Sequence, residues 1–222
     1  ARFDPSSPGE AVAAALAEAA IAAEFAPAAA QLLAATLQTP LAVDGLRLNQ
    51  LAPGSQIREL EFLFPIGVPD MPALAAAIGP GQGADGRLAE RVARLTPQRA
   101  EGFLKGFIDL VFEHDGRLHL LDYKSNWLGP RFADYAEAQL AAAMAAENYD
   151  LQALLYAVAL HRLQGWRRPD YDYERHGGSA WYLFLRGMGP EHPGSGVFHW
   201  RPSRQLVEQV DACLARQAGL LT

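Results

Sequence analysis

Two apolar runs joined by a tight turn restrict the fold of this chain more than any other feature. Residues 103–112 and 117–123 are strand-like, and His114-Asp115-Gly116 separates them. An Asp-Gly step between two apolar runs is a strong indication of a β-hairpin. The sequence therefore predicts an antiparallel strand pair over residues 103–124.

This hairpin would bring two carboxylates together. If the turn is centred near Asp115, Asp109 lies across from about residue 121 and is a near neighbour of Asp122. Asp122 and Lys124 are two residues apart, so they project from the same face of one strand. An unpaired carboxylate at the rim of an apolar core costs roughly several kcal/mol, which a divalent cation would remove. Hard oxygen ligands favour magnesium or manganese over zinc.

Lys124 would complete a hydrolytic set with the two carboxylates. An ammonium group beside a metal site can position or help to deprotonate a water, and can offset charge that develops on a phosphate. The alternative is that Asp109 and Asp122 end their strands and that Lys124 simply pairs with one of them, as is common for an isolated Asp-x-Lys. The upstream Asp109 in a strand–turn–strand frame favours the first interpretation.

Three further residues are candidates for the site. Glu61, on a predicted strand, could join the metal shell, but Glu59 lies two residues earlier and makes a surface ion pair equally compatible. Gln152 and Tyr156 are four residues apart on one helix face. They could contact substrate phosphates or orient Lys124, and the alternative is a helix face half-buried against the sheet.

The rest of the chain shows both helical and strand-like patterns. Helices are expected within 9–39, the first after Pro8-Gly9 and the second from near Pro27. Residues 67–86, rich in Gly, Pro and Asp, are expected to form a mobile loop around a short helical stretch at 72–78. The remaining expected elements are a strand at 57–66, one or two helices within 132–164 with a possible break at Asn148, strands at 179–186 and 196–200, and a helix at 203–218.

Bulk properties limit the class of protein. A length of 222 residues, half of them hydrophobic, suits one globular domain. The single cysteine, Cys213, excludes an internal disulfide and a cysteine-bound cluster, and we expect it in the core near a helix end of a cytoplasmic protein. No apolar run has transmembrane length, and Ala1–Pro5 does not resemble a signal peptide, so no membrane association is expected.

The net charge of -6 argues against binding DNA by bulk charge alone. A nuclease remains compatible with this charge if a metal offsets the carboxylates or another subunit grips the DNA. The local basic groups are expected to be solvated faces rather than DNA-binding surfaces. They are Arg87, Arg91, Arg94, Arg99 and Lys105, and then Arg162, Arg167, Arg168 and Arg175.

The residues of the hairpin and its continuation resemble a known family. Gly106–Phe112 and Leu120–Gly129 are similar to the C-terminal nuclease domain of the RecB family, the beta subunits of the helicase–nuclease RecBCD, or exodeoxyribonuclease V. The run Asp-Tyr-Lys-Ser-Asn-Trp-Leu-Gly at 122–129 is far more specific than a bare Asp-x-Lys. The resemblance is dense from about 57 to 200 and thin over the first 40 residues.

The resemblance implies the restriction-endonuclease-like α/β fold of the PD-(D/E)xK superfamily. This fold has a mixed central sheet flanked by helices, here with an Ala-rich helical N-terminal segment. The chain is then expected to be a single nuclease domain over 1–222, with a helical part at 1–56, a catalytic core at 57–200 and a C-terminal helix at 201–222.

The resemblance also implies roles for individual residues. Asp109, Asp122 and the backbone carbonyl of Tyr123 are expected to bind Mg²⁺, with Mn²⁺ or Ca²⁺ able to substitute in binding. Lys124 is the expected catalytic lysine, Glu61 matches an acidic active-site position, and Gln152 and Tyr156 match a helix motif that follows the core. The family cuts DNA during recombinational repair of double-strand breaks, with RecC- and RecD-like subunits and RecA as partners.

One departure from the family bears on activity. The family has a metal-binding histidine in an early helix motif, whereas this chain has no histidine before His114 and is expected to begin downstream of that motif. We therefore expect weaker magnesium binding and weak activity from this chain alone. A docking module for RecA or partner subunits is the alternative from another functional class. A stand-alone restriction-type enzyme is a weaker third interpretation.

Overall fold

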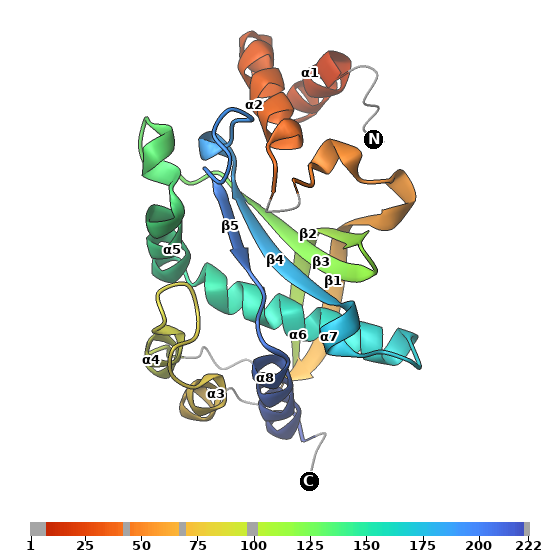
Figure 1. Ribbon diagram of the computed structural model, residues 1–222, viewed down its shortest axis with the longest axis vertical. Helices are drawn as coiled ribbons and strands as arrows, with labels where there is room; N and C mark the ends of the chain where they lie inside the picture. The colour runs from red at the N-terminus through yellow and green to blue at the C-terminus, as the bar shows by residue number, and fades with distance from the viewer. Residues whose placement is uncertain (1–7, 42–44, 67–69, 97–101, 220–222) are drawn as a thin grey trace.

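The computed structural model describes residues 8–41, 45–66, 70–96 and 102–219, with five strands in one mixed sheet (Figure 1). The strands lie side by side in chain order: β1 (Gln56–Ile66), β2 (Gly102–His114), β3 (Arg117–Lys124), β4 (Gly177–Phe184) and β5 (Val197–Trp200). Neighbouring strands are antiparallel except β3 and β4, which are parallel. The predicted mixed sheet is confirmed, and its parallel pair requires a long connection.

The predicted hairpin is the β2–β3 pair. Asp115 and Gly116 both have positive φ angles, 50° and 74°, as a two-residue hairpin turn requires. The register pairs Leu110 with Leu121, so the next residue back along β2, Asp109, is level with Asp122 rather than with residue 121. This one-residue difference brings the two carboxylates closer together than the sequence estimate did.

Helices cover both faces of the sheet. The larger hydrophobic core lies between one face and α6 (Tyr149–Arg167), which crosses the strands in Figure 1. The other helices that contribute to this core are α3 (Met71–Ile78), α4 (Leu88–Ala93), α5 (Glu137–Ala146) and α8 (Arg204–Gln217). The α5–α6 segment supplies the crossover between the parallel strands β3 and β4.

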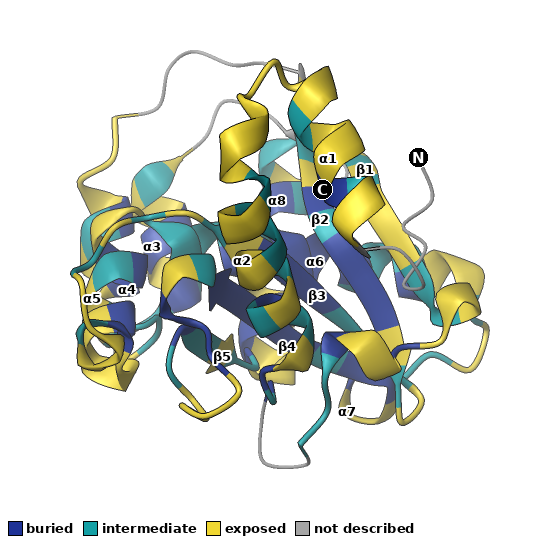
Figure 2. Ribbon diagram, turned by 90° about the horizontal axis from the view of Figure 1, so that it is seen from above, coloured by how far each residue is buried: buried dark blue, intermediate teal, exposed yellow. Residues whose placement is uncertain are grey.

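A smaller core lies on the opposite face. Leu41 and Leu48 pack there in one cluster with Leu121 and Leu183, and Leu37 of α2 (Ala26–Gln38) contacts it. Figure 2 shows that α1 (Pro8–Glu18) and the outer side of α2 are exposed, above strands that are largely buried. Helix α2 and the leucines that follow it are therefore a cover for one face of the sheet.

Most predicted elements are confirmed. The strand expected at 57–66 is β1, those at 179–186 and 196–200 are β4 and β5, and the C-terminal helix is α8. The break expected near Asn148 separates α5 from α6, and Asn148 has a left-handed φ of 53°. The first helix begins at Pro8 rather than after Gly9, because proline is favoured in the first turn of a helix.

The short helix expected at 72–78 is confirmed as α3, and the residues between α3 and α4 form the expected loop. Asp70 caps α3 by accepting a hydrogen bond from Ala73 N at 2.9 Å, and α4 begins at Leu88, after the loop. Leu74, Ile78 and Leu88 are buried in the larger core. Residues 67–69 and Arg99 lie outside the described residues.

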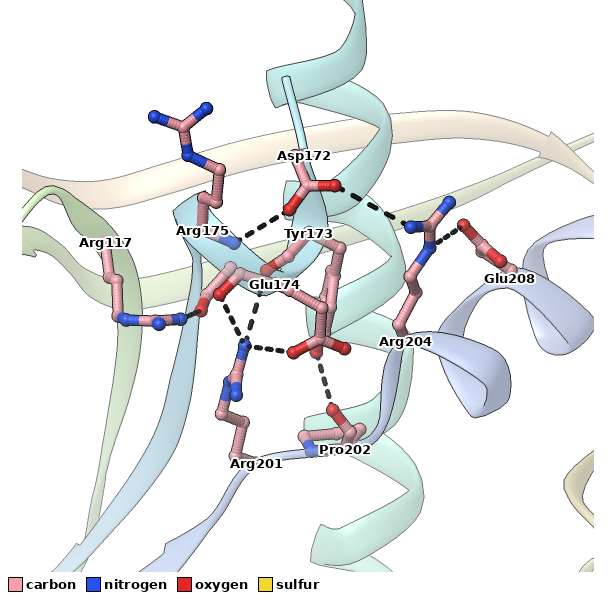
Figure 3. A network of polar contacts seen from close by, with 10 residues as sticks. Arg117, Asp172, Tyr173, Glu174, Arg175, Arg201, Pro202, Arg204 and Glu208 are labelled. Atoms are coloured by element: carbon pink, nitrogen blue, oxygen red, sulfur yellow. Dashed lines mark hydrogen bonds and ion pairs between the residues drawn. The ribbon is translucent and has the colours of Figure 1, made fainter. Parts of the chain in front are cut away.

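The C-terminal helix is held by polar contacts around the short helix α7 (Tyr173–His176), shown in Figure 3. Tyr173 donates a hydrogen bond through its hydroxyl to the carbonyl of Pro202 at 2.8 Å, and Asp172 forms an ion pair with Arg204 at 3.7 Å. Ser203 caps α8. Cys213 is buried within α8, as predicted, and no helix among the described residues is long and apolar enough to cross a bilayer.

His119, on β3, is a buried acceptor in the sheet. Its Nδ1 accepts hydrogen bonds from the backbone N–H of Ser179 at 3.1 Å and from Trp181 Nε1 at 3.3 Å. Burial, with the nearby His114 as a second cause, lowers the pKa of His119 to about 4. Protonation of Nδ1 would break both hydrogen bonds, so the folded protein keeps this ring neutral.

We predict that His119 makes the protein less stable in acid. Between pH 6.5 and about 4 the unfolded chain protonates this residue and the folded chain does not, so the stability is present above this window and is lost as the pH falls. The loss is on the order of 3 kcal/mol, measured by urea unfolding across this range. His119→Asn should flatten that pH dependence, and His192→Asn, on an exposed loop, should not; identical pH profiles for all three proteins would contradict the prediction.

Candidate active site

Asp122 and Lys124 form a nearly buried ion pair at the end of β3. Lys124 Nζ lies 2.6 Å from Asp122 Oδ1, and the two side chains are 11% and 6% exposed. Burial raises the pKa of Asp122; the Lys124 ammonium opposes that rise, and the Asp109 carboxylate adds to it. The two carboxylates are thus close enough to repel each other, as the hairpin register indicates.

Helix α6 and strand β4 surround the Lys124 ammonium. Its Nζ donates a hydrogen bond to Gln152 Oε1 at 3.1 Å and lies 3.9 Å from the centre of the Tyr149 ring. The centre of the Tyr182 ring, on β4, is 5.1 Å away. A cation desolvated against aromatic faces gains electrostatic stabilisation. The sequence-predicted lysine therefore has a fixed position rather than a mobile surface one.

Gln152 is held at both ends of its amide. Its Oε1 also accepts a hydrogen bond from the Tyr182 hydroxyl at 3.0 Å, and its Nε2 donates to the Tyr156 hydroxyl at 2.9 Å. Burial, together with the Asp122 charge, raises the pKa of Tyr156 to about 12, so this phenol stays neutral. These contacts match the predicted role of orienting Lys124. Gln152 contacts the lysine directly, and Tyr156 contributes by accepting a hydrogen bond from Gln152.

Asp109 lies where the β2–β3 ladder ends. Its Oδ2 accepts a hydrogen bond from the backbone N–H of Tyr123 at 2.9 Å, one residue beyond the point level with Asp109. Asp109 and Tyr123 also line a cavity of about 490 Å³ with Arg58 and residues of α2. The carboxylate therefore lies beside both Asp122 and an opening to solvent.

Glu61 lies on β1, farther from this group. It is opposite Phe107 on β2, and its carboxylate pairs with Lys105 Nζ at 2.8 Å in a half-exposed position. The β1–β2 register makes Glu59, rather than Glu61, level with Asp109. Glu59 has a left-handed φ of 51°, a conformation that is uncommon for a residue other than glycine.

The donor set suits magnesium. Asp109, Asp122 and the carbonyl of Tyr123 offer hard oxygen ligands at one end of the hairpin. Within the described ranges no three His, Cys, Asp or Glu side chains gather to hold a metal ion, so the donor set consists of two carboxylates and one backbone carbonyl. Magnesium commonly keeps several waters and takes only one or two carboxylates, whereas zinc prefers nitrogen and sulfur ligands. The residues present therefore fit a magnesium ion.

Asp150 was missed by the sequence analysis. Its side chain is 0% exposed, forms an ion pair with Arg91, and accepts a hydrogen bond from Ala84 N at 2.9 Å. Arg91 also pairs with Asp85, so its assignment to a solvated face is wrong. An acidic residue between Tyr149 and Gln152, at the start of a helix, was the available signal. This contact fixes the end of α6 that carries Gln152.

A family profile described as the PD-(D/E)XK nuclease superfamily matches residues 4–219 of the chain. Among curated proteins, the RecBCD enzyme subunit RecB of Escherichia coli K12 is 42% identical over 196 residues, which are 86% of this chain and 16% of that protein. RecB of Mycobacterium tuberculosis H37Rv is 38% identical over 218 residues, 87% of this chain and 20% of that protein. RecB of Haemophilus influenzae is 48% identical over 114 residues, 51% of this chain and 9% of that protein.

The chain thus spans a fifth or less of the length of these relatives. The matched stretches of the Escherichia coli and Mycobacterium proteins nevertheless cover most of this chain. This agrees with the resemblance to a RecB C-terminal nuclease domain that the hairpin residues indicated.

We predict that Arg91→Ala destabilises the protein by about 3 kcal/mol or more, because it leaves the Asp150 carboxylate buried without its cation. The measurement is urea unfolding monitored by circular dichroism. Arg87→Ala is the matched control, because Arg87 forms an exposed pair with Glu90 that is worth less than about 1 kcal/mol. Equal losses in the two variants would show that the Arg91–Asp150 pair does not anchor α6.

Proposed function

The chain belongs to the PD-(D/E)XK nuclease superfamily, and from this we propose that it is a magnesium-dependent DNA nuclease domain of a RecB-type helicase–nuclease. The observation that carries the proposal is the arrangement of Asp109, Asp122 and Lys124 at one end of the β2–β3 hairpin. Superfamily membership alone supports a nuclease, and this arrangement supports an active one.

In the proposed mechanism each polar group has a separate task. Asp109, Asp122 and the Tyr123 carbonyl would hold Mg²⁺, which when bound polarises a phosphoryl oxygen and makes a coordinated water more acidic. Lys124 would hold the attacking water and offset negative charge on the phosphate. Gln152 keeps the Lys124 ammonium aimed at this position through the hydrogen bond to Oε1.

We also propose a cellular compartment and partner proteins for this activity. The relatives are named as RecB subunits of the RecBCD enzyme, so we propose that the domain works in the cytoplasm with RecC- and RecD-like subunits and with RecA. The net charge of -6 agrees with DNA being delivered by other parts of such a complex. We propose that residues 1–222 form one nuclease domain, because α2, Leu41 and residues 45–51 cover the same sheet that carries the site.

Docking of a partner protein is the second candidate function. Leu63, Phe103 and Phe107 are exposed on neighbouring positions of β1 and β2, which favours a protein contact there. A docking module needs no metal, so it would tolerate loss of Asp109. The metal measurements below therefore separate the two candidates.

We predict that manganese binds this chain and that Asp109→Ala and Asp122→Ala abolish the binding, because each removes a hard oxygen ligand. Isothermal titration calorimetry with Mn²⁺ measures it directly. Glu113→Ala, a carboxylate removed from the turn end of the same hairpin, is the matched control and should bind as the wild type does. Absence of binding by the wild-type chain would overturn the proposed metal site and favour docking.

Cleavage is the second measurement on the same variants. With two carboxylates and one backbone carbonyl as metal ligands, we expect slow digestion of linear DNA by this chain in Mg²⁺, and loss of roughly 100-fold or more of that rate in Lys124→Ala. Fast digestion would show that these three ligands are sufficient for full activity. Digestion that survives Lys124→Ala and Asp122→Ala would contradict the proposed site.

Glu61 is proposed to act on the metal shell through a water rather than as a direct ligand, because it lies on the strand next to Asp109 and two positions along. We predict that Glu61→Gln lowers the cleavage rate about 10-fold, in the range for residues that support metal ligands. Glu113→Gln, at the turn end of the β2–β3 hairpin, is the matched control and should leave the rate unchanged. Equal rates for the Glu61→Gln variant and the wild type would remove Glu61 from the site.

A further inference from the structure

An exposed tryptophan lies directly beside the proposed active site. Trp127 is 65% exposed and follows Lys124 by three residues, a stretch that spans at most about 11 Å when extended. A single exposed aromatic residue is common on protein surfaces and needs no functional explanation. Its position and the rigidity of its loop are what distinguish Trp127.

The loop that carries Trp127 is anchored on both sides of the indole. Before it, the Ser125 carbonyl accepts a hydrogen bond from Arg186 Nε at 3.0 Å, and Asn126 Oδ1 accepts one from the Tyr149 hydroxyl at 3.3 Å. After it, Leu128 N donates to the Tyr135 hydroxyl at 3.2 Å. The backbone is thus fixed while the indole itself faces solvent.

These anchors also connect the loop to the catalytic lysine. Tyr149, which holds Asn126, is the residue whose ring lies 3.9 Å from Lys124 Nζ. The position of the Trp127 backbone relative to the lysine is therefore set by packed residues. A flat aromatic face at a fixed distance from the reacting phosphate is what an unpaired nucleobase requires for stacking.

A cation lies at the same edge of the sheet. Because β3 and β4 are parallel and Lys124 is level with Phe184, the segment after each strand emerges at this edge. Arg186 is exposed there, and its guanidinium carbon is 5.8 Å from the centre of the Trp127 ring. Its Nη groups make no hydrogen bond to the residues that the structure describes, so their donors are available for a phosphate.

We propose that Trp127 and Arg186 form a binding subsite for single-stranded DNA, in which a base next to the scissile phosphate stacks on the indole and Arg186 binds the neighbouring phosphate. This inference rests on the proposed function, because it names the form of DNA that the site accepts. A base inside a duplex has no free face for Trp127, so the subsite selects an unpaired strand.

The test is binding of a fluorescent single-stranded oligonucleotide, measured by anisotropy in Ca²⁺ or in EDTA so that cleavage is not required. Trp127→Ala should weaken binding roughly 5- to 100-fold, the range for loss of one base–aromatic stack. Trp127→Phe should recover most of the affinity, because it keeps an aromatic face. Arg186→Ala should weaken binding and reduce its dependence on salt.

Trp166→Ala is the matched control. Trp166 is 84% exposed and lies near the far end of α6, about 21 Å along the helix from Gln152. An abasic nucleotide moved along the oligonucleotide should reduce wild-type affinity at one position and leave the Trp127→Ala variant unaffected there. These readouts do not depend on cleavage, and Mn²⁺ binding by the variant shows that the metal site is intact.

Three results would overturn the proposal. They are no binding of single strands by the wild type at low salt, equal affinity in Trp127→Ala and wild type, and equal losses in Trp127→Ala and Trp166→Ala. The second result, together with loss of binding to a partner protein, would assign Trp127 to a protein contact instead. Failure of the proposed nuclease function would appear separately, as absent Mn²⁺ binding or cleavage.

Discussion

The nearly buried ammonium of Lys124 is the constraint on which the rest of the site depends. A cation that has lost most of its water must be compensated by charge, hydrogen bonds and aromatic faces that arrive from different elements. Here β3 supplies Asp122, α6 supplies Gln152 and Tyr149, and β4 supplies the Tyr182 ring. The Lys124 ammonium therefore helps to fix the positions of α6, β3 and β4 relative to one another.

The same requirement extends outward along α6. Asp150, two residues before Gln152, is a second buried charge, and it is compensated by Arg91 at the end of α4. The two buried ion pairs hold the first turn of α6 between the sheet and the α3–α4 segment. Hydrophobic packing alone would leave that turn free to shift, since apolar contacts are not directional.

The sequence was informative where the determining interactions are local. The Asp-Gly turn predicted the hairpin and, through it, the proximity of Asp109 and Asp122, and the Asn148 break separated two helices. It was not informative where partners are distant in the chain. Nothing near Arg91 indicates that its partner is Asp150, so a basic residue within a polar stretch was read as a surface residue. The contact of Gln152 with Lys124 was one of the roles considered from the sequence, but the choice among those roles needed the crossover that brings α6 under β3.

The cover formed by α2, Leu41 and residues 45–51 has a consequence for the order of folding. Leu37, Leu41 and Leu48 pack in the smaller core with Trp181 and Leu183, so the first part of the chain binds a surface completed by almost the last strand. That surface exists only after the parallel β3–β4 pair has closed its long crossover, which is a slow, non-local step. On a ribosome the N-terminal helices would emerge first and dock last. Until then, the apolar stripe of α2 would be accessible to chaperones, and the sheet face it covers would be open to mispairing.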